Sequence, residues 1–84
     1  MEHIMEVYYY TRKKCPLCED GLLILQKLQR EYPFKLIEKD IEKSDELTEK
    51  FGLMIPVVEI QGEIIQYGII DPVTIDKRLR EYGS

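Results

Sequence analysis

The residues best suited to chemistry in this chain are its only two cysteines, which lie three positions apart in Cys15-Pro16-Leu17-Cys18. They stand between a strand-like run and a helix-like run, so Cys15 is expected at the start of a helix. Unpaired backbone N–H groups and the positive end of the helix dipole favour the thiolate at that place. Cys18 follows one turn later, near enough to form a disulfide with Cys15. The pair therefore predicts a dithiol redox site.

The two cysteines are expected to have different roles. Cys15 is the expected nucleophile, because it precedes the helix and would be the more exposed thiol. Cys18 is the expected resolving thiol, which attacks a mixed disulfide on Cys15 and releases the reduced product. Arg12, in the basic loop before Cys15, would add positive charge beside the thiolate. The alternative for this loop is an ordinary solvated surface.

Three other uses of the cysteine pair compete with redox chemistry. A structural disulfide would close so short a loop that it would constrain little unfolded-state entropy. A zinc site usually needs four ligands, and the chain has no second Cys-x-x-Cys and only one histidine, His3. Two small buried residues without chemistry are the third alternative. The pattern favours redox chemistry, with no metal ligands and no bound cofactor.

Length and composition set the class of protein. With 84 residues the chain is expected to form one domain, residues 1–84. The net charge of −4 disfavours a nucleic-acid partner. No apolar run approaches the roughly 20 residues that span a bilayer. The first residues lack the features of a signal peptide, so we expect a cytoplasmic protein, where oxidised cysteine pairs are usually catalytic or regulatory. We also expect a monomer.

Periodicity divides the chain into alternating strands and helices. Residues 4–10 are β-branched and aromatic, and Tyr8-Tyr9-Tyr10 within them is interpreted as strand packing. A helix is predicted from Pro16, whose missing N–H suits the first turn, to Tyr32, where Pro33 stops it. Residues 34–39 alternate as a second strand.

The second half of the chain carries clear cap and turn signals. Ser44 is the predicted N-cap of a short helix, and Gly52 is its predicted left-handed end. Strands are predicted at 57–60 and 63–67 around the hairpin turn Gln61-Gly62. Asp71, read as an N-cap, starts a last helix. The order βαβαββα predicts an α/β fold with a central four-stranded mixed sheet flanked by helices, in which a parallel βαβ unit with a right-handed crossover precedes a hairpin.

This order, with Cys-x-x-Cys opening the first helix, resembles the thioredoxin fold over nearly the whole chain. Within that superfamily the sequence is most similar to the small glutaredoxins and glutaredoxin-like proteins. Its motif differs from the glutaredoxin Cys-Pro-Tyr-Cys only at Leu17, and Arg12 stands where glutaredoxins carry a basic residue three positions before the first cysteine. The resemblance implies a thiol–disulfide oxidoreductase that acts on a disulfide-containing protein or a small thiol, with an external thiol or dithiol as reductant.

A second matching segment is Ile55-Pro56-Val57, which corresponds to the family's Val-Pro step. The resemblance implies that Pro56 follows a cis peptide bond and faces the cysteines. It also implies that the backbone of Ile55 is available to pair with an extended substrate. The supporting residues of the expected site are therefore Arg12, Pro16, Leu17, Ile55 and Pro56, beside the catalytic Cys15 and Cys18.

The sequence departs from glutaredoxins where they hold the glutamyl end of glutathione. The family has a Gly-Gly and an acidic pair there, whereas this chain has Gly68-Ile69-Ile70-Asp71. Leu17 also removes the phenol that flanks the reactive thiol in many members. These departures predict poor use of glutathione, and the simpler interpretation of Ile69 and Ile70 is burial over the last helix.

Two rival functions keep the same fold. The cysteines could bind a metal or bridge an iron–sulfur cluster, but in cluster-binding glutaredoxins glutathione supplies further ligands, and the weak glutathione site argues against this. Alternatively, the chain could be an interaction module whose cysteines have lost turnover.

Overall fold

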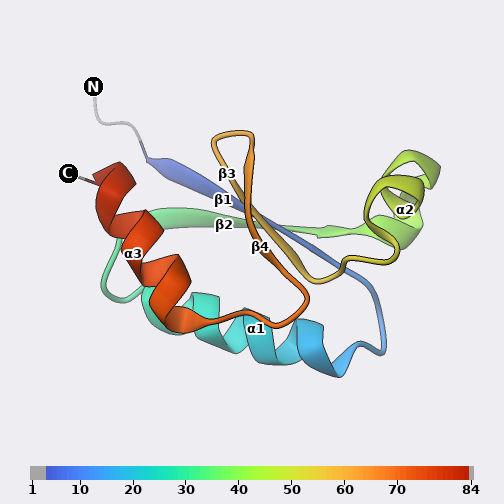
Figure 1. The fold of residues 1–84 in the computed structure, drawn as a ribbon, viewed down its shortest axis with the longest axis horizontal. Helices are drawn as coiled ribbons and strands as arrows, with labels where there is room; N and C mark the ends of the chain where they lie inside the picture. The colour runs from blue at the N-terminus through green and yellow to red at the C-terminus, as the bar shows by residue number, and fades with distance from the viewer. Residues whose placement is uncertain (1–3, 84) are drawn as a thin grey trace.

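The computed structural model describes residues 4–83, which form a four-stranded sheet with helices packed around it (Figure 1). His3, the one histidine, lies outside the described residues. The elements follow the predicted order, with one added 3₁₀ turn, η1: β1 (Met5–Thr11), α1 (Pro16–Leu28), β2 (Phe34–Asp40), η1 (Ile41–Lys43), α2 (Asp45–Phe51), β3 (Val57–Ile60), β4 (Glu63–Tyr67) and α3 (Pro72–Gly83).

The strand order in the sheet is β2-β1-β3-β4. β1 runs parallel to β2 and antiparallel to β3, and β4 pairs antiparallel with β3. The parallel register places Thr11 opposite Asp40, so β1 and β2 end at the same edge of the sheet. The predicted mixed sheet of an α/β fold is confirmed.

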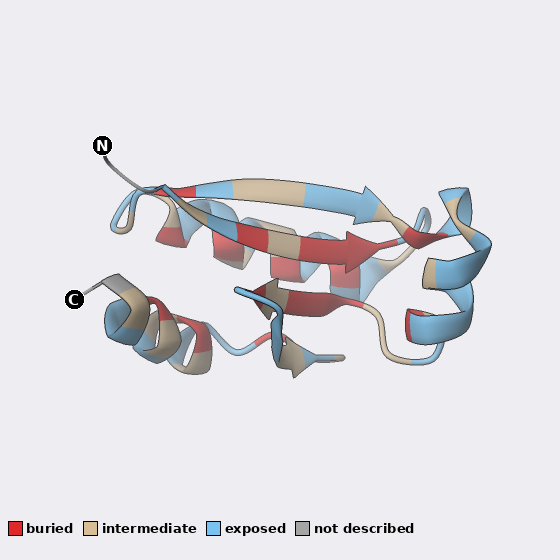
Figure 2. Ribbon diagram, turned by 90° about the horizontal axis from the view of Figure 1, so that it is seen from above, coloured by how far each residue is buried: buried red, intermediate tan, exposed pale blue. Residues whose placement is uncertain are grey.

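Helices cover the two faces of the sheet unequally. On one face α1 and α3 bury a large cluster that includes Val7, Tyr9, Leu25, Ile75 and Leu79. Figure 2 shows the buried positions of α1 recurring along one side of the helix, as an amphipathic helix requires. On the other face α2 covers a smaller cluster at one end of the sheet, formed by Tyr10, Ile41, Phe51 and Val57. No helix within residues 4–83 is long and apolar enough to cross a membrane.

Most predicted caps and turns are confirmed. The Ser44 hydroxyl accepts a hydrogen bond from the Leu47 N–H at 3.2 Å, as an N-cap does. Gln61 and Gly62 have φ values of 51° and 79°, which are the positive values that a tight two-residue hairpin requires. The Asp71 carboxylate accepts hydrogen bonds from the Val73 N–H at 3.2 Å and the Thr74 hydroxyl at 2.9 Å, which makes Asp71 the cap of α3.

Two predicted helix ends are wrong. Gly52 is right-handed, with φ −55° and ψ −30°, because the chain continues into a turn in which both Met54 and Ile55 donate to the Phe51 carbonyl. α1 ends at Leu28 and not at Tyr32. The residues after it form a turn, and Pro33 disfavours helical backbone in the residue before it.

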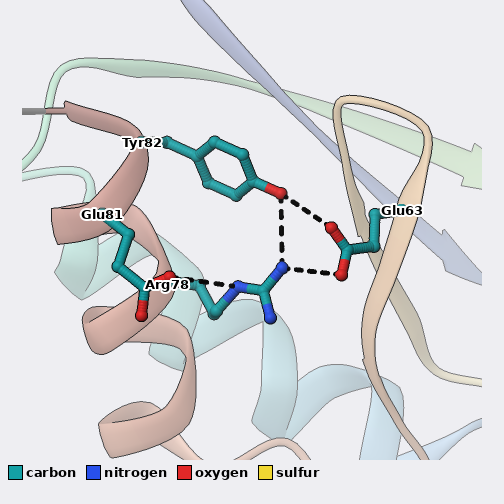
Figure 3. Close-up of polar contacts among 4 residues, drawn as sticks. All are labelled: Glu63, Arg78, Glu81 and Tyr82. Atoms are coloured by element: carbon teal, nitrogen blue, oxygen red, sulfur yellow. Dashed lines mark hydrogen bonds and ion pairs between the residues drawn. The ribbon is translucent and has the colours of Figure 1, made fainter.

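A polar cluster ties α3 to the β3–β4 hairpin (Figure 3). Arg78 Nη2 lies 2.7 Å from a Glu63 carboxylate oxygen, and the Tyr82 hydroxyl donates to the other oxygen at 3.1 Å. Arg78 Nε also lies 3.9 Å from a Glu81 carboxylate oxygen. The hydrogen bond from Arg78, followed by that from Tyr82, lowers the pKa of Glu63 below its usual 4.5.

This cluster predicts an acid-dependent part of the stability. Because the folded-state pKa of Glu63 is lowered, its contribution is present above about pH 4.5 and is lost as pH falls through the folded-state pKa. Urea unfolding of the wild type should therefore lose more stability between about pH 5 and about pH 3 than unfolding of Glu63→Gln. The matched control is Glu49→Gln, which removes an exposed carboxylate on α2. This variant should keep the wild-type dependence of stability on pH. Equal acid dependence in wild type and Glu63→Gln would contradict the assignment.

Candidate functional site

The two cysteines form a disulfide across the first turn of α1, with their Cα atoms 5.2 Å apart. Cys15 is the N-cap of the helix, and its Sγ accepts a hydrogen bond from the Cys18 N–H at 3.1 Å. Pro16 occupies the first helical position, as predicted. The sulfur of Cys15 thus takes the place that a Ser or Asp oxygen usually takes at a helix start. The arrangement allows reversible opening and closing of one disulfide.

The two cysteines differ in how far they are buried. Cys18 is only 4% exposed, whereas Cys15 is half-buried. Leu17, between them, is 47% exposed and projects from the first turn. A molecule that approaches from solvent therefore meets Cys15 before Cys18.

A hollow beside the cysteines mixes charges of both signs. Arg12, Lys13 and Lys14 come from the loop between β1 and α1, and all three are exposed. The hollow is lined in addition by Cys15, Cys18, Leu22 and these residues of the strands, α1 and η1: Thr11, Glu19, Glu38, Asp40 and Lys43. The structure therefore places Arg12 in the same hollow as the cysteines, and its support of a Cys15 thiolate stays a prediction. Leu17, Ile55 and Pro56 do not line this hollow.

The residues of β2 and η1 that line the hollow were not predicted from the sequence. Glu38 and Asp40 lie on β2, and Lys43 ends η1. Thr11, one residue beyond the run 4–10 singled out in the sequence, is the last residue of β1 and is only 6% exposed. The signal that was available was the parallel βαβ unit, since parallel neighbours bring their carboxyl ends to one edge.

The Ile55–Pro56 peptide bond is cis, the form that the family resemblance implies. Pro56 is buried, and contact between Pro56 and the cysteines stays a prediction. The Ile55 N–H donates to the Phe51 carbonyl at 3.1 Å. This donor is already used, so the expectation that the Ile55 backbone is available to an extended substrate does not hold for its N–H group.

The segment between β4 and α3 has already used several of its backbone donors. The Gly68 N–H, where φ is +80°, lies 2.9 Å from the Pro56 carbonyl oxygen and 3.1 Å from that of Met54. The Asp71 N–H donates to the Gln66 side-chain oxygen at 2.7 Å, and the Val73 N–H donates to the Asp71 carboxylate. The N–H groups of Gly68, Asp71 and Val73 are therefore engaged within the chain.

The two isoleucines of this segment differ in burial. Ile70 is 6% exposed and belongs to the large core cluster, as expected. Ile69 is 75% exposed, so its expected burial is wrong. It projects from a segment that packs on α1 through its neighbour Ile70, whose Cγ1 lies beside Gly21.

Over residues 4–83, no three or more His, Cys, Asp or Glu side chains gather in a group that could hold a metal ion.

Comparisons with known proteins agree with this geometry. Solved structures that match closely include a protein of Nitrosomonas europaea, with a TM-score of 0.79 and 22% identity over 93% of this chain and 94% of the other. A protein of X. campestris matches with a TM-score of 0.76 and 20% identity, over 89% of this chain and 96% of the other. Thioredoxin 1 of Thermosipho africanus matches with a TM-score of 0.64 and 18% identity, over 95% and 100%. These likenesses establish the thioredoxin-like fold.

No curated protein sequence is significantly similar to the chain. The sequence profile of the Glutaredoxin-like domain (DUF836) matches residues 6–80, which include both cysteines and most of the fold. The chain belongs to the Glutaredoxin-like domain (DUF836) family.

Proposed function

We propose that the protein is a small thiol–disulfide oxidoreductase that uses Cys15 as nucleophile and Cys18 as resolving thiol. The observation that carries the proposal is the half-buried N-cap sulfur of Cys15, which accepts the Cys18 N–H and lies within disulfide reach of a buried second cysteine. A helix-start N–H supports negative charge on sulfur, and the thiolate is the attacking form. Arg12, with its neighbouring lysines, is proposed to support the same charge.

The proposed reaction transfers two electrons from the cysteine pair to a substrate disulfide. The Cys15 thiolate attacks one substrate sulfur, the substrate S–S bond breaks, and the second substrate sulfur leaves as a thiolate that takes up a proton. Cys18 then loses its proton and attacks the Cys15 sulfur of the mixed disulfide. The first substrate sulfur leaves, and the Cys15–Cys18 disulfide forms. An external dithiol, or two thiols, then reduces this disulfide and completes the cycle.

Exposed apolar side chains on α1 and on the segment that packs against it favour a substrate with apolar groups beside its disulfide. Leu17 is 47% exposed on the first turn of α1, and Ile69 is 75% exposed on the segment that packs on α1. We propose a disulfide-containing protein, or the disulfide of a small apolar thiol compound, as substrate. Glutathione has charged ends and no apolar side chain, so it fits this surface poorly.

Selective alkylation tests the roles of the two cysteines. In the reduced native protein, Cys15 should react with iodoacetamide roughly tenfold faster or more near neutral pH, because it combines exposure, helix-start donors and nearby cations. Peptide mass spectrometry after short reaction times measures both rates. Denatured protein, in which both thiols are exposed, is the control. Faster labelling of Cys18 in the native protein would overturn the assignment.

Trapping tests the function directly. Cys18→Ser should accumulate a mixed disulfide with a model substrate disulfide, because Cys15 can attack but nothing resolves the product. Cys15→Ser should not accumulate one, because Cys18 is buried. Non-reducing mass spectrometry detects the adduct, and circular dichroism checks that both variants fold. An adduct in Cys15→Ser alone, or in neither variant, would contradict the proposed function.

Glutathione binding should be weak. Losing two or three hydrogen bonds of roughly 1 kcal/mol each in the segment before α3 weakens binding about 30- to 160-fold. Calorimetric titration of glutathione against the reduced and oxidised protein measures the affinity, and turnover of a glutathionylated peptide measures its use. A Cys-Pro-Tyr-Cys glutaredoxin serves as the comparison. Affinity or turnover equal to that of the glutaredoxin would show that the segment has been misinterpreted.

A further inference from the structure

Behind the cysteines lies a buried tyrosine whose hydroxyl is not explained by packing alone. Tyr9, in the middle of β1, is 0% exposed, and its hydroxyl donates to the Cys18 carbonyl at 2.8 Å. The ring reaches α1 because Gly21 has no side chain, since a Cβ there would collide with the Tyr9 hydroxyl. Burial raises the pKa of Tyr9 above its usual range, so the hydroxyl keeps its proton and remains a donor.

Cys18 links Tyr9 to the Cys15 sulfur through its own backbone carbonyl and N–H groups. The Cys18 carbonyl accepts from Tyr9, and the Cys18 N–H donates to Cys15 Sγ at 3.1 Å. These two groups flank one Cα atom, so the hydrogen bond to Tyr9 restricts the position and tilt of the donor that faces Cys15. Hydrogen bonds to charged groups depend strongly on distance and alignment. A small shift of Cys18 would therefore weaken the support of a Cys15 thiolate.

We propose that Tyr9 is a positioning residue for the redox site, whose hydroxyl holds Cys18 in the place from which its N–H stabilises a thiolate on Cys15. The inference rests on the proposed function of the cysteines. Tyr9 contacts neither the Cys15 sulfur nor a substrate, and acts through Cys18.

Other charged groups line the same hollow as Cys15 and must stay constant in any test. They come from every element around the hollow: Arg12, Lys13 and Lys14 from the loop, Glu19 from α1, Glu38 and Asp40 from β2, and Lys43 from η1. Tyr9→Phe changes none of these charges. It removes one hydroxyl and leaves the ring that packs in the core.

The chain offers a matched control in the next residue. Tyr10 is also buried, and its hydroxyl also makes one hydrogen bond, to a Glu59 carboxylate oxygen at 2.9 Å. It packs on Phe51 at the opposite face of the sheet, with ring centroids 4.5 Å apart, away from the cysteines. Tyr10→Phe thus costs a similar hydrogen bond without touching Cys18.

The experiment measures the pH profile of Cys15 alkylation and the reduction potential of the disulfide in wild type, Tyr9→Phe and Tyr10→Phe. Tyr9→Phe should move the midpoint of the alkylation profile upward, so that the thiolate fraction below the midpoint falls about threefold. At a pH above both midpoints, where the thiolate predominates in the reduced protein, its potential should become more negative by about 14 mV, which is a threefold change converted at 29.6 mV per tenfold. Tyr10→Phe should match wild type in both readouts, although both variants lose stability.

The outcomes separate positioning from structure and from the proposed function. If Tyr9→Phe is less stable but keeps the wild-type profile and potential, Tyr9 is structural only and the inference is wrong. If wild type fails to reduce any substrate disulfide while Tyr9→Phe still shifts the profile, the proposed function fails and the positioning role stands.

A measurement on the unaltered protein covers the case in which Tyr9→Phe does not fold. In wild type with ¹³C-labelled tyrosine rings, the Cζ resonance of Tyr9 and the amide resonance of Cys18 should both follow the titration of Cys15. The Cζ resonance of Tyr10 should not. A Tyr9 resonance that ignores the Cys15 titration would overturn the inference.

Discussion

The close approach of α1 to the sheet at Gly21 is the contact on which the site depends. A Cβ at this position would meet the Tyr9 hydroxyl and would lie 2.8 Å from Ile70 Cγ1. Because glycine has no Cβ, α1 packs at this one point against both β1 and the segment before α3. That point lies one turn from Cys18, so it also sets where α1 begins relative to the end of β1. Glycine inside a helix costs about 0.5–1 kcal/mol relative to alanine, and the packing that it allows here offsets that cost.

Much of the fold could be predicted because its signals are local. Ser44, Asp71 and the Gln61-Gly62 turn act through hydrogen bonds or φ values within three residues, so the sequence alone reveals them. The predicted left-handed helix end at Gly52 is wrong because glycine permits that conformation without requiring it. The turn that follows it depends on where Pro56 and β3 lie, and those positions are set by the tertiary fold. Local chemistry therefore located the elements but not all of their ends.

The site divides along the same line. A motif located the cysteine pair, Pro16 and Arg12 in the sequence, but it did not indicate the hydrogen bond from Tyr9 to Cys18. Tyr8, Tyr9 and Tyr10 look alike in the sequence, and strand alternation sends only Tyr9 toward α1. Strand packing was the right interpretation for all three rings. The hydroxyl of Tyr9 differs only because Gly21, twelve residues later, leaves room for it beneath Cys18.

The backbone N–H groups at the start of α3 could either cap the helix or bind an anionic ligand. A free helix N-terminus attracts anions because its first N–H groups lack partners. At α3 the Asp71 carboxylate already occupies the Val73 N–H, and the Gln66 side chain occupies the Asp71 N–H. The negative charge that favours this helix end is therefore supplied by the chain itself, and it would repel a ligand carboxylate. Exposed Ile69 beside this capped end leaves an apolar surface where an anion-binding protein would present donors. The residues that cap α3 are thus the same ones on which the proposed weak binding of glutathione rests.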